Sequence, residues 1–363
     1  MTPALTVPSS SGSYPIYLAD SGFSGLGPAL AAAGLGAQVV VVSNPVVGAL
    51  YRGGVADALA DGRRIVLHAE IPDGEAHKTL ETWGALVEDL LALGVDRGTA
   101  VLALGGGVTG DIAGFAAATA LRGLPLVVLP TTLLAMVDSA VGGKTGVNCR
   151  AGKNGVGAFH APSLVYAALD TLRTLPAAEL RCGLGEVVKH GLIGDPGLLD
   201  LCRTEAGAIL DGDPALLRAL VARSCTVKAA VVGADEREAG DRMILNLGHT
   251  VGHALETALG FGALRHGEAV AIGLLAEARW AAARRACGPD VVSTIEAVID
   301  ALGLPDHPPP IARAAVLAAA AFDKKRASGI LRIPYIRSVG HAELLAIPAS
   351  EIPGIFDHLS LED

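Results

Sequence analysis

The residues best suited to bind a metal ion are a group of histidines and one carboxylate in the C-terminal half of the chain. Three of the ten histidines, His249, His253 and His266, lie close together in the sequence. His249 and His253 are four residues apart, so on a helix they share one face, as paired metal ligands often do. Glu186, in an otherwise apolar helical stretch, is a candidate third ligand. The pattern predicts a divalent-metal site, although histidines with purely structural roles would show the same spacing.

A glycine-rich loop is typical of a second kind of site. The run from Gly105 to Asp111 follows a predicted strand, begins a predicted helix and satisfies G-x-G-x-x-G. Its glycines let the backbone approach a pyrophosphate, which the helix N-terminus then stabilises. The acidic residue expected ~20 residues further on to bind a ribose is missing, and the candidates for that contact are Asn44 and the Glu75/Lys78 pair. The loop predicts dinucleotide binding, with an ordinary strand-to-helix turn as the alternative.

Several lysines stand in glycine-rich segments where a phosphate could be held. Lys144 lies in Gly-Gly-Lys-Thr, which resembles the end of a P-loop, but the first glycine of that motif would fall at about Val137. This mismatch excludes a nucleotide triphosphatase. Lys144 and Lys153 can still bind a substrate phosphate as point charges, whereas solvated surface lysines are the alternative. The charge run 324–326 is typical of an exposed turn.

The elements that must position these groups change in type along the chain. In the N-terminal half, apolar strand-like runs alternate with helical runs, which is typical of a buried parallel sheet with helices on its faces. Thr6–Val7 and Tyr14–Leu18 predict a hairpin. The predicted strands are 38–42, 64–68, 100–104 and 126–129, and the predicted helices of this half are 79–93 and 108–120. From about residue 170 the pattern becomes long Ala/Leu-rich helices, namely 176–190, 214–232, 250–259, 268–286 and 291–302.

These patterns predict two domains. The first, 1–172, is an α/β domain with a parallel, Rossmann-like sheet, and it would bind the dinucleotide. The second, 173–363, is an all-α domain that would bind the metal and the substrate. We expect the active site in the cleft between the two domains.

Composition narrows the classes of partner. The chain has 363 residues, and its 28 basic and 37 acidic side chains give a net charge of −9, which without a basic tract argues against nucleic acid as the main partner. The apolar run 123–137 contains two prolines and falls short of the ~20 residues of a membrane-spanning helix. Five scattered cysteines without a CxxC pair, and the lack of any cationic side chain before Arg52, predict a cytoplasmic protein.

Taken together and in order, the motifs resemble the 3-dehydroquinate synthases, which are sugar-phosphate cyclases. The resemblance runs from about residue 38 to 326. The segments that carry it are 105–111, 130–135, 138–145, 152–154, 186–189, 245–253 and 266–268.

The resemblance implies a role for each matching position. It implies that Glu186, His249 and His266 bind zinc or cobalt(II), with His253 near the substrate and not on the metal. The positions matching the NAD contacts are Asn44, Glu75, Lys78, Gly105, Gly106, Gly107, Asp111, Thr131, Thr132, Asp138, Lys153 and Thr174. The positions matching the phosphate contacts are Arg122, Lys144, Asn154 and either Lys324 or Lys325. Those around the substrate carboxylate are Lys228, Arg242 and Asn246, and Lys189 lies near the reacting hydroxyls.

The implied activity is conversion of 3-deoxy-D-arabino-heptulosonate 7-phosphate to 3-dehydroquinate and phosphate, a step of the shikimate pathway to aromatic amino acids. NAD would be catalytic and not consumed, and Arg122 would reach across the interface of a homodimer. The alternatives are another sugar-phosphate cyclase of secondary metabolism, a metal-dependent polyol dehydrogenase of the glycerol type, and a non-catalytic binding protein. Asp111, Lys144 and Asn246 favour the dehydroquinate branch. Arg265 and Val46 depart from the family pattern.

Overall fold

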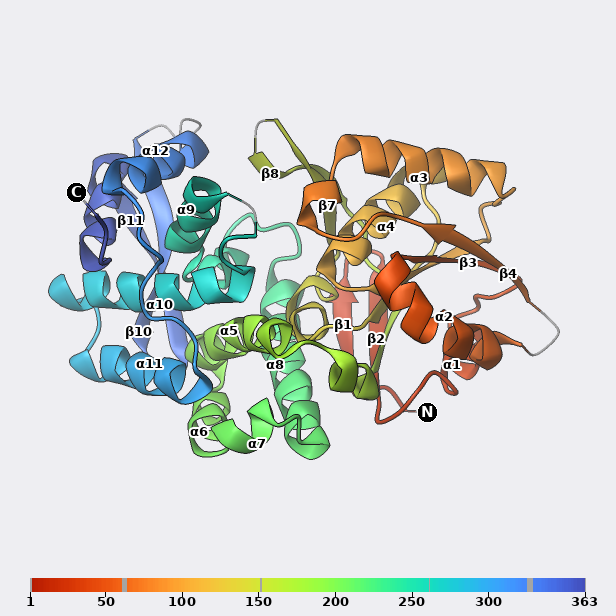
Figure 1. Ribbon diagram of the computed structural model, residues 1–363, viewed down its shortest axis with the longest axis horizontal. Helices are drawn as coiled ribbons and strands as arrows, with labels where there is room; N and C mark the ends of the chain where they lie inside the picture. The colour runs from red at the N-terminus through yellow and green to blue at the C-terminus, as the bar shows by residue number, and fades with distance from the viewer. Residues whose placement is uncertain (1, 61–63, 151, 261, 325–328, 363) are drawn as a thin grey trace. The chain divides into compact units, whose positions relative to one another are not determined.

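The computed structural model describes residues 2–60, 64–150, 152–260, 262–324 and 329–362 (Figure 1), with the side chains of 321–324 outside that description. The chain packs into two compact units. The first comprises Met1–Leu175 and Leu217–Glu236, and the second comprises Pro176–Leu216 and Arg237–Asp363.

The first unit contains, in the described part of the chain, a seven-stranded sheet in the order β1-β2-β9-β6-β5-β3-β4. The β1–β2 pair is antiparallel and every other pair is parallel, so the predicted α/β fold is confirmed. The predicted hairpin and strands are also present, but β4 was predicted to be buried and is mostly exposed or half-buried, because it lies at the edge of the sheet; β9 was not predicted. The strands are β1 (Leu5–Ser9), β2 (Gly12–Ala19), β3 (Gln38–Ser43), β4 (Ile65–Glu70), β5 (Ala100–Gly105), β6 (Leu126–Pro130) and β9 (Leu164–Ala168).

Helices follow the parallel strands and pack on the sheet. They are α1 (Leu26–Ala32), α2 (Pro45–Leu59), α3 (Leu80–Ala92) and α4 (Gly107–Thr119), of which α1 and α2 were not predicted. Asn44 caps α2 by accepting a hydrogen bond from the Val47 amide, and Thr79 caps α3 in the same way through Thr82. The valines of β3 and the apolar residues of β5 are buried, which explains their continuous apolar sequence.

The order of the strands reverses beside β3. The chain passes from β3 to β4 on one side and then returns to place β5 on the other side of β3. The carboxyl ends of β3 and β5 therefore flank a topological switch point, where ligands of open α/β sheets bind. Asn44 follows β3 directly, and Gly105–Gly107 lie at the end of β5.

Helix α8 (Pro214–Ala234) belongs mainly with the first unit, whereas the sequence-based division at residue 172 places it in the second domain. The Cys225 thiol donates to the Met136 carbonyl at 3.2 Å, and Lys228 Nζ lies 2.7 Å from the Asp138 carbonyl. These contacts tie the helix to the α/β fold. Its Ala/Leu-rich sequence gave no sign of them, because it matches the pattern of the other C-terminal helices.

The second unit is helical, as predicted, and also holds one antiparallel hairpin that the prediction of an all-α domain did not include. The hairpin is formed by β10 (Ile330–Ser338) and β11 (His341–Pro348) (Figure 1). Its residues Ile333, Tyr335 and Ile347 join the apolar core that contains Trp280 and Phe356. The helices are α5 (Ala177–Gly194), α6 (Pro196–Thr204), α7 (Ala206–Leu210), α9 (His249–Leu259), α10 (His266–Ala283), α11 (Pro289–Leu302) and α12 (Arg313–Lys324).

Glycines let three of these helices approach at backbone contact. A Cβ built on Gly267 of α10 would lie 1.7 Å from the carbonyl oxygen of Cys182 in α5. A Cβ on Gly273 of α10 would lie 1.9 Å from the carbonyl oxygen of Gly248, which precedes α9. Helix α10 is therefore fixed against both α5 and the start of α9 at distances that no side chain permits.

In the described part of the chain, we find no helix with both the length and the apolar character needed to cross a membrane.

Replacing Gly267 by Ala should destabilise the second unit by about 3 kcal/mol, the upper end of the cost of overpacking a core, because the clash is with backbone. The matched control is Gly207→Ala in α7, where a Cβ meets nothing within 4 Å. That change should raise stability by about 0.5 kcal/mol. Denaturant unfolding of both variants tests this account, and equal stability of the two would contradict it.

Candidate active site

Three side chains from three helices of the second unit form a candidate metal site. Glu186 on α5, His249 at the start of α9 and His266 at the start of α10 each offer one ligand atom, and these atoms lie within 4.8 Å of one another. Oε1 of Glu186 is 3.6 Å from Nε2 of His249 and 3.4 Å from Nε2 of His266. Imidazole nitrogen and carboxylate oxygen are donors that zinc and cobalt(II) bind in proteins.

The burial of Glu186 tests whether this group fits a metal ion. Its side chain is fully buried, and its Oε1 has no hydrogen-bond partner. A buried carboxylate oxygen without a donor costs free energy, so such atoms are normally satisfied by a cation or a hydrogen bond. A divalent ion between Oε1 and the two imidazoles would supply that partner. The residues present therefore fit a divalent metal ion.

The charge states of these residues also suit metal binding. Burial opposes ionisation of Glu186, but Lys189, His266 and His249 outweigh it and hold the pKa of Glu186 well below its usual range. Burial, assisted by the positive charge of Lys189, holds the pKa of His249 well below its usual value, so its imidazole is neutral at pH 7. Burial also lowers the pKa of His266, but Glu186 and Glu256 outweigh it and raise that pKa to about 9. A metal ion would replace the proton on His266.

His253 lies beside the three-residue group but does not belong to it. Its ring centroid is 5.2 Å from that of His249 and 6.1 Å from that of His266. It instead forms a second potential ligand group with Glu256 and His266. The helical spacing of His249 and His253 is thus present, yet the carboxylate with an unpartnered oxygen faces His249 and His266.

Glu256 is a residue of this site that the sequence analysis missed. It is 5% exposed, and its Oε2 lies 3.5 Å from Nδ1 of His266, on the side of the ring opposite Glu186. A carboxylate at this nitrogen fixes the orientation of a ligand imidazole and raises its basicity. Glu256 stands seven residues after His249 in an apolar helix, so both lie on one helix face, and this spacing was the available signal.

In the loop after β5, close contacts with neighbouring side chains explain why glycine occupies positions 105 and 106. A Cβ on Gly105 would lie 2.5 Å from Oγ1 of Thr109, and one on Gly106 would lie 3.2 Å from Cγ2 of Thr132. Asn44, at the end of the neighbouring strand, donates from Nδ2 to Asp73 at 2.6 Å. The loop, Thr132 and Asn44 therefore surround the switch point, in the arrangement expected of a dinucleotide site.

Lys78 is the centre of an ion-pair and hydrogen-bond group beside this loop. It is 5% exposed, and its Nζ lies 2.5 Å from Asp111 Oδ2 and 2.6 Å from Asn154 Oδ1. Burial raises the pKa of Asp111, and the charge of Lys78 opposes that shift. Lys78 thereby joins the segment before α3, the glycine loop and the hairpin of β7 (Lys144–Cys149) and β8 (Gly152–Phe159).

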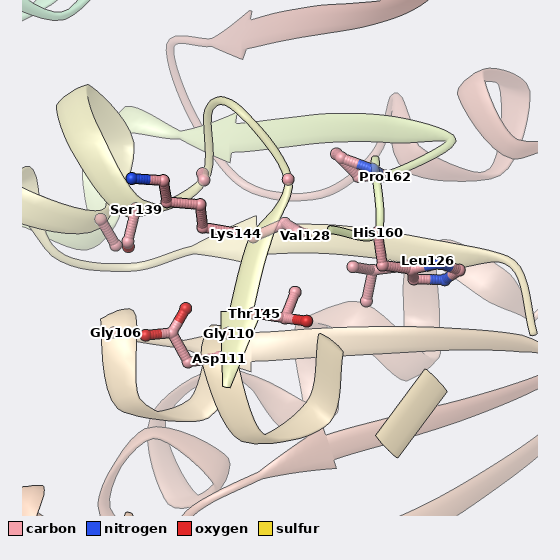
Figure 2. A pocket seen from close by; sticks show the side chains of 13 residues that line it. Gly106, Gly110, Asp111, Leu126, Val128, Ser139, Lys144, Thr145, His160 and Pro162 are labelled. Carbon is pink, nitrogen blue, oxygen red and sulfur yellow. The ribbon is translucent and has the colours of Figure 1, made fainter. Parts of the chain in front are cut away.

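A small pocket lies between the glycine loop and the β7–β8 hairpin. Figure 2 shows Lys144 and Ser139 on one side of it and Asp111 and Thr145 on the other, with His160 at the end formed by β6. Lys144 is exposed at the start of β7. The pocket thus combines an exposed cation with glycine backbone, which suits an anionic group.

The remaining residues of the first unit that were predicted to bind NAD or substrate differ in their contacts and exposure. Lys228 Nζ pairs with Asp138 at 2.5 Å, which links a residue predicted to bind substrate with one predicted to bind NAD. Thr174 bonds the Tyr51 hydroxyl. Arg122 is exposed and, like Leu121 before it, adopts a left-handed backbone conformation. Thr131 is buried and Lys153 is half-buried.

Three further predicted residues lie in the second unit, and two lie beyond the described side chains. The Lys189 ammonium pairs with Glu186, Arg242 is buried, and Asn246 donates to Glu238 at 2.6 Å. The side chain of Lys324, at the end of α12, and all of Lys325 lie outside the described residues.

Comparison with known proteins agrees with this geometry. The family profile described as 3-dehydroquinate synthase N-terminal matches residues 68–182, and the one described as 3-dehydroquinate synthase C-terminal matches residues 183–326. A 3-dehydroquinate synthase of Pelobacter propionicus is 44% identical over 96% of this chain and 97% of its own length. The chain belongs to the 3-dehydroquinate synthase family. The resemblance stated from the sequence motifs is thereby confirmed.

Solved structures of other sugar-phosphate cyclases are also similar to this member of the family. A 2-deoxy-scyllo-inosose synthase complexed with carbaglucose-6-phosphate, NAD+ and Co2+ is 26% identical, with a TM-score of 0.88 over 97% of this chain and 98% of that chain. The 2-epi-5-epi-valiolone synthase of Streptomyces hygroscopicus subsp. jinggangensis, with NAD+ and Zn2+ bound, is 30% identical, with a TM-score of 0.85 over 94% and 95% of the two chains.

Replacing His266 by Ala should abolish stoichiometric metal binding, because it removes one of three ligands. The matched control is His253→Ala, which should keep the metal because His253 lies outside the group around Glu186. Glu256→Gln should weaken metal affinity by about 10–100-fold, the usual cost of losing a partner that orients a ligand. Metal analysis after dialysis against a chelator distinguishes the three variants. Loss of metal from His253→Ala with retention in His266→Ala would reverse the assignment.

Proposed function

We propose that this chain converts 3-deoxy-D-arabino-heptulosonate 7-phosphate to 3-dehydroquinate and phosphate, using catalytic NAD and a divalent metal. The observation that carries the proposal is the buried Glu186 carboxylate, whose unpartnered oxygen faces two imidazoles in a member of this family. The similar cyclases that hold NAD+ with Co2+ or Zn2+ support the choice of cofactors. The metal would be held by Glu186, His249 and His266.

When bound, the metal supplies Lewis acidity to a substrate hydroxyl and NAD reversibly accepts a hydride, which together permit phosphate elimination. The chain's own residues supply positioning and proton transfer. Lys189 is buried and paired with Glu186, and the role we assign to it is to hold a proton near the reacting hydroxyls. His253, beside two of the ligands, is a candidate proton carrier near the substrate.

The anionic ends of the substrate require cations and donors. Lys144, Asn154, Arg122 and the lysine at 324 or 325 would hold the phosphate, while Lys228, Arg242 and Asn246 would hold the carboxylate. A neutral polyol would need none of these, so they favour a cyclase over a dehydrogenase. Within the cyclases, Asp111, Lys144 and Asn246 favour the dehydroquinate branch over those of secondary metabolism. Holding both ends of one substrate supplies the orientation that ring closure needs.

We further infer a cytoplasmic homodimer in which Arg122 completes the partner's phosphate site. Two features of the chain support this. All five cysteines lie among the described residues, and none of them forms a disulfide. Arg122 is exposed on a backbone with two consecutive left-handed residues, a costly conformation that is usually retained for a function.

The purified protein with NAD, zinc and the heptulosonate phosphate should release phosphate over many turnovers without net NADH, because the same hydride returns to the same substrate. Lys144→Ala should lose phosphate release by about 100-fold or more, the scale of one lost electrostatic contact to developing charge, while NAD affinity changes little. Arg97→Ala, which removes another exposed cation of the first unit, is the matched control and should behave as wild type.

Absorbance of NADH and a phosphate assay, read in the same cuvette, check this expectation. If NADH accumulates in equal amount to the substrate consumed, the protein is a dehydrogenase and the proposal is wrong. Release of phosphate from a hexose phosphate but not from the heptulosonate phosphate would assign the chain to a different cyclase branch.

A further inference from the structure

Asn148 lies at an irregularity of the β7–β8 hairpin. Val147 pairs with Val156, and Cys149 pairs with Gly152, so the register shifts across the residue between them. Between these two pairs β7 has one residue, Asn148, whereas β8 has three, 153–155, so β8 bulges opposite Asn148. Bulges next to active sites commonly turn a side chain toward a particular target.

The backbone and side chain of Asn148 form hydrogen bonds with three residues in two segments. Its amide N donates to the Lys78 carbonyl at 2.8 Å, and its Nδ2 donates to Glu75 Oε1 at 2.8 Å. Its Oδ1 accepts from the backbone N of Asn154 at 2.9 Å. Together with the bond from Lys78 Nζ to Asn154 Oδ1 and the bond from Lys78 N to Glu75 O at 3.1 Å, these contacts close a ring through Glu75, Asn148, Asn154 and Lys78.

The chemistry of the ring requires an amide at position 148. A side-chain amide has a donor nitrogen and an acceptor oxygen on one short planar group, whereas an ionised carboxylate is an acceptor only. The donor faces the Glu75 carboxylate, and the acceptor faces the N–H of Asn154. Asn154 has a φ of 49°, a left-handed conformation that asparagine adopts more readily than most non-glycine residues. The bond from Asn148 helps to hold Asn154 in that conformation.

We propose that Asn148 is a positioning residue that couples the NAD half of the site to its phosphate half. The proposal rests on the proposed function, which assigns Glu75 and Lys78 to NAD and Asn154 to the substrate phosphate. When NAD orders Glu75 and Lys78, the hydrogen bonds of Asn148 also hold Asn154 in place for phosphate, and phosphate bound at Asn154 holds Glu75 and Lys78 in the same way. The two ligands should therefore strengthen each other's binding, and by thermodynamic linkage they should do so equally.

The experiment measures the dissociation constant of NAD by calorimetry, with and without saturating inorganic phosphate, in the metal-loaded protein. In wild type, phosphate should tighten NAD binding by about fivefold or more, the lower end of typical coupling. In Asn148→Ala, the ratio of the NAD dissociation constant without phosphate to that with phosphate should fall to about one. The unfolding midpoint of this variant should stay close to that of wild type. Arg150→Ala, exposed in the same hairpin turn, is the matched control and should keep the wild-type ratio.

A double-mutant cycle tests the contact with Glu75 directly. Asn148→Asp keeps the acceptor for Asn154 but sets a carboxylate against Glu75, so it should weaken NAD binding more than Asn148→Ala does. In a Glu75→Gln background, the loss of NAD affinity caused by Asn148→Asp should be about tenfold smaller. The reason is that the amide at position 75 can donate to the new carboxylate.

These outcomes separate the inference from the proposed function. A wild-type ratio of one, or a ratio unchanged in Asn148→Ala, overturns the coupling even if the protein releases phosphate from the heptulosonate phosphate. Equal costs of Asn148→Asp in the two backgrounds likewise overturn the role of Asn148. Normal coupling without turnover supports the inference and counts against the proposed function alone.

Discussion

The buried carboxylate of Glu186 is the constraint on which the second unit depends. Removing an ionised carboxylate from water costs several kcal/mol, at the order of magnitude seen for buried ions in proteins, unless cations compensate it. Lys189 on the same helix supplies one charge, and His249 and His266 must be brought from two other helices. The glycines at 185, 248, 267 and 273 allow that approach, since each lies where a Cβ would meet the backbone of a neighbouring segment. The close packing of these helices is therefore what brings the three candidate metal ligands together.

The first unit depends on backbone geometry in the same way. Its parallel sheet brings the ends of β3 and β5 together at the switch point, and glycines keep the loop after β5 free of side chains there. The β7–β8 hairpin then supplies Lys144 and Asn154, and Asn148, opposite the bulge in β8, ties it to the segment that holds Lys78. Positions that sequence motifs identify separately are thus joined by a few hydrogen bonds between loops.

The parts of the fold that the sequence predicted are those with a strong local pattern. Continuous apolar runs gave β3 and β5, and helical periodicity gave α5, α9 and α11 to within a few residues. The β7–β8 hairpin was missed because its glycines are typical of a loop. In the structure they permit close strand contact, since a Cβ on Gly157 would lie 2.1 Å from the Thr145 carbonyl. The β10–β11 hairpin was missed because Pro334 and Arg332 interrupt the strand pattern.

The candidate site shows the same limit. Spacing within one helix identified His249 and His253, but no local rule could select His266, which reaches Glu186 only through packing of α10 on α5. The family resemblance was needed for that choice. The spacing of Glu256 from His249 shows only that both lie on one helix face, and the contacts of Glu256 with His266 and of Asn148 with Glu75 are tertiary contacts that no motif reveals. The central claim is that these residues serve a reaction in which a hydride leaves the substrate and returns to it. Substrate deuterated at the carbon that gives up the hydride tests this most directly, with product and cofactor analysed by mass spectrometry. We expect the product to retain the deuterium and the NAD pool to stay unlabelled, whereas deuterium released into free NADH would contradict the account.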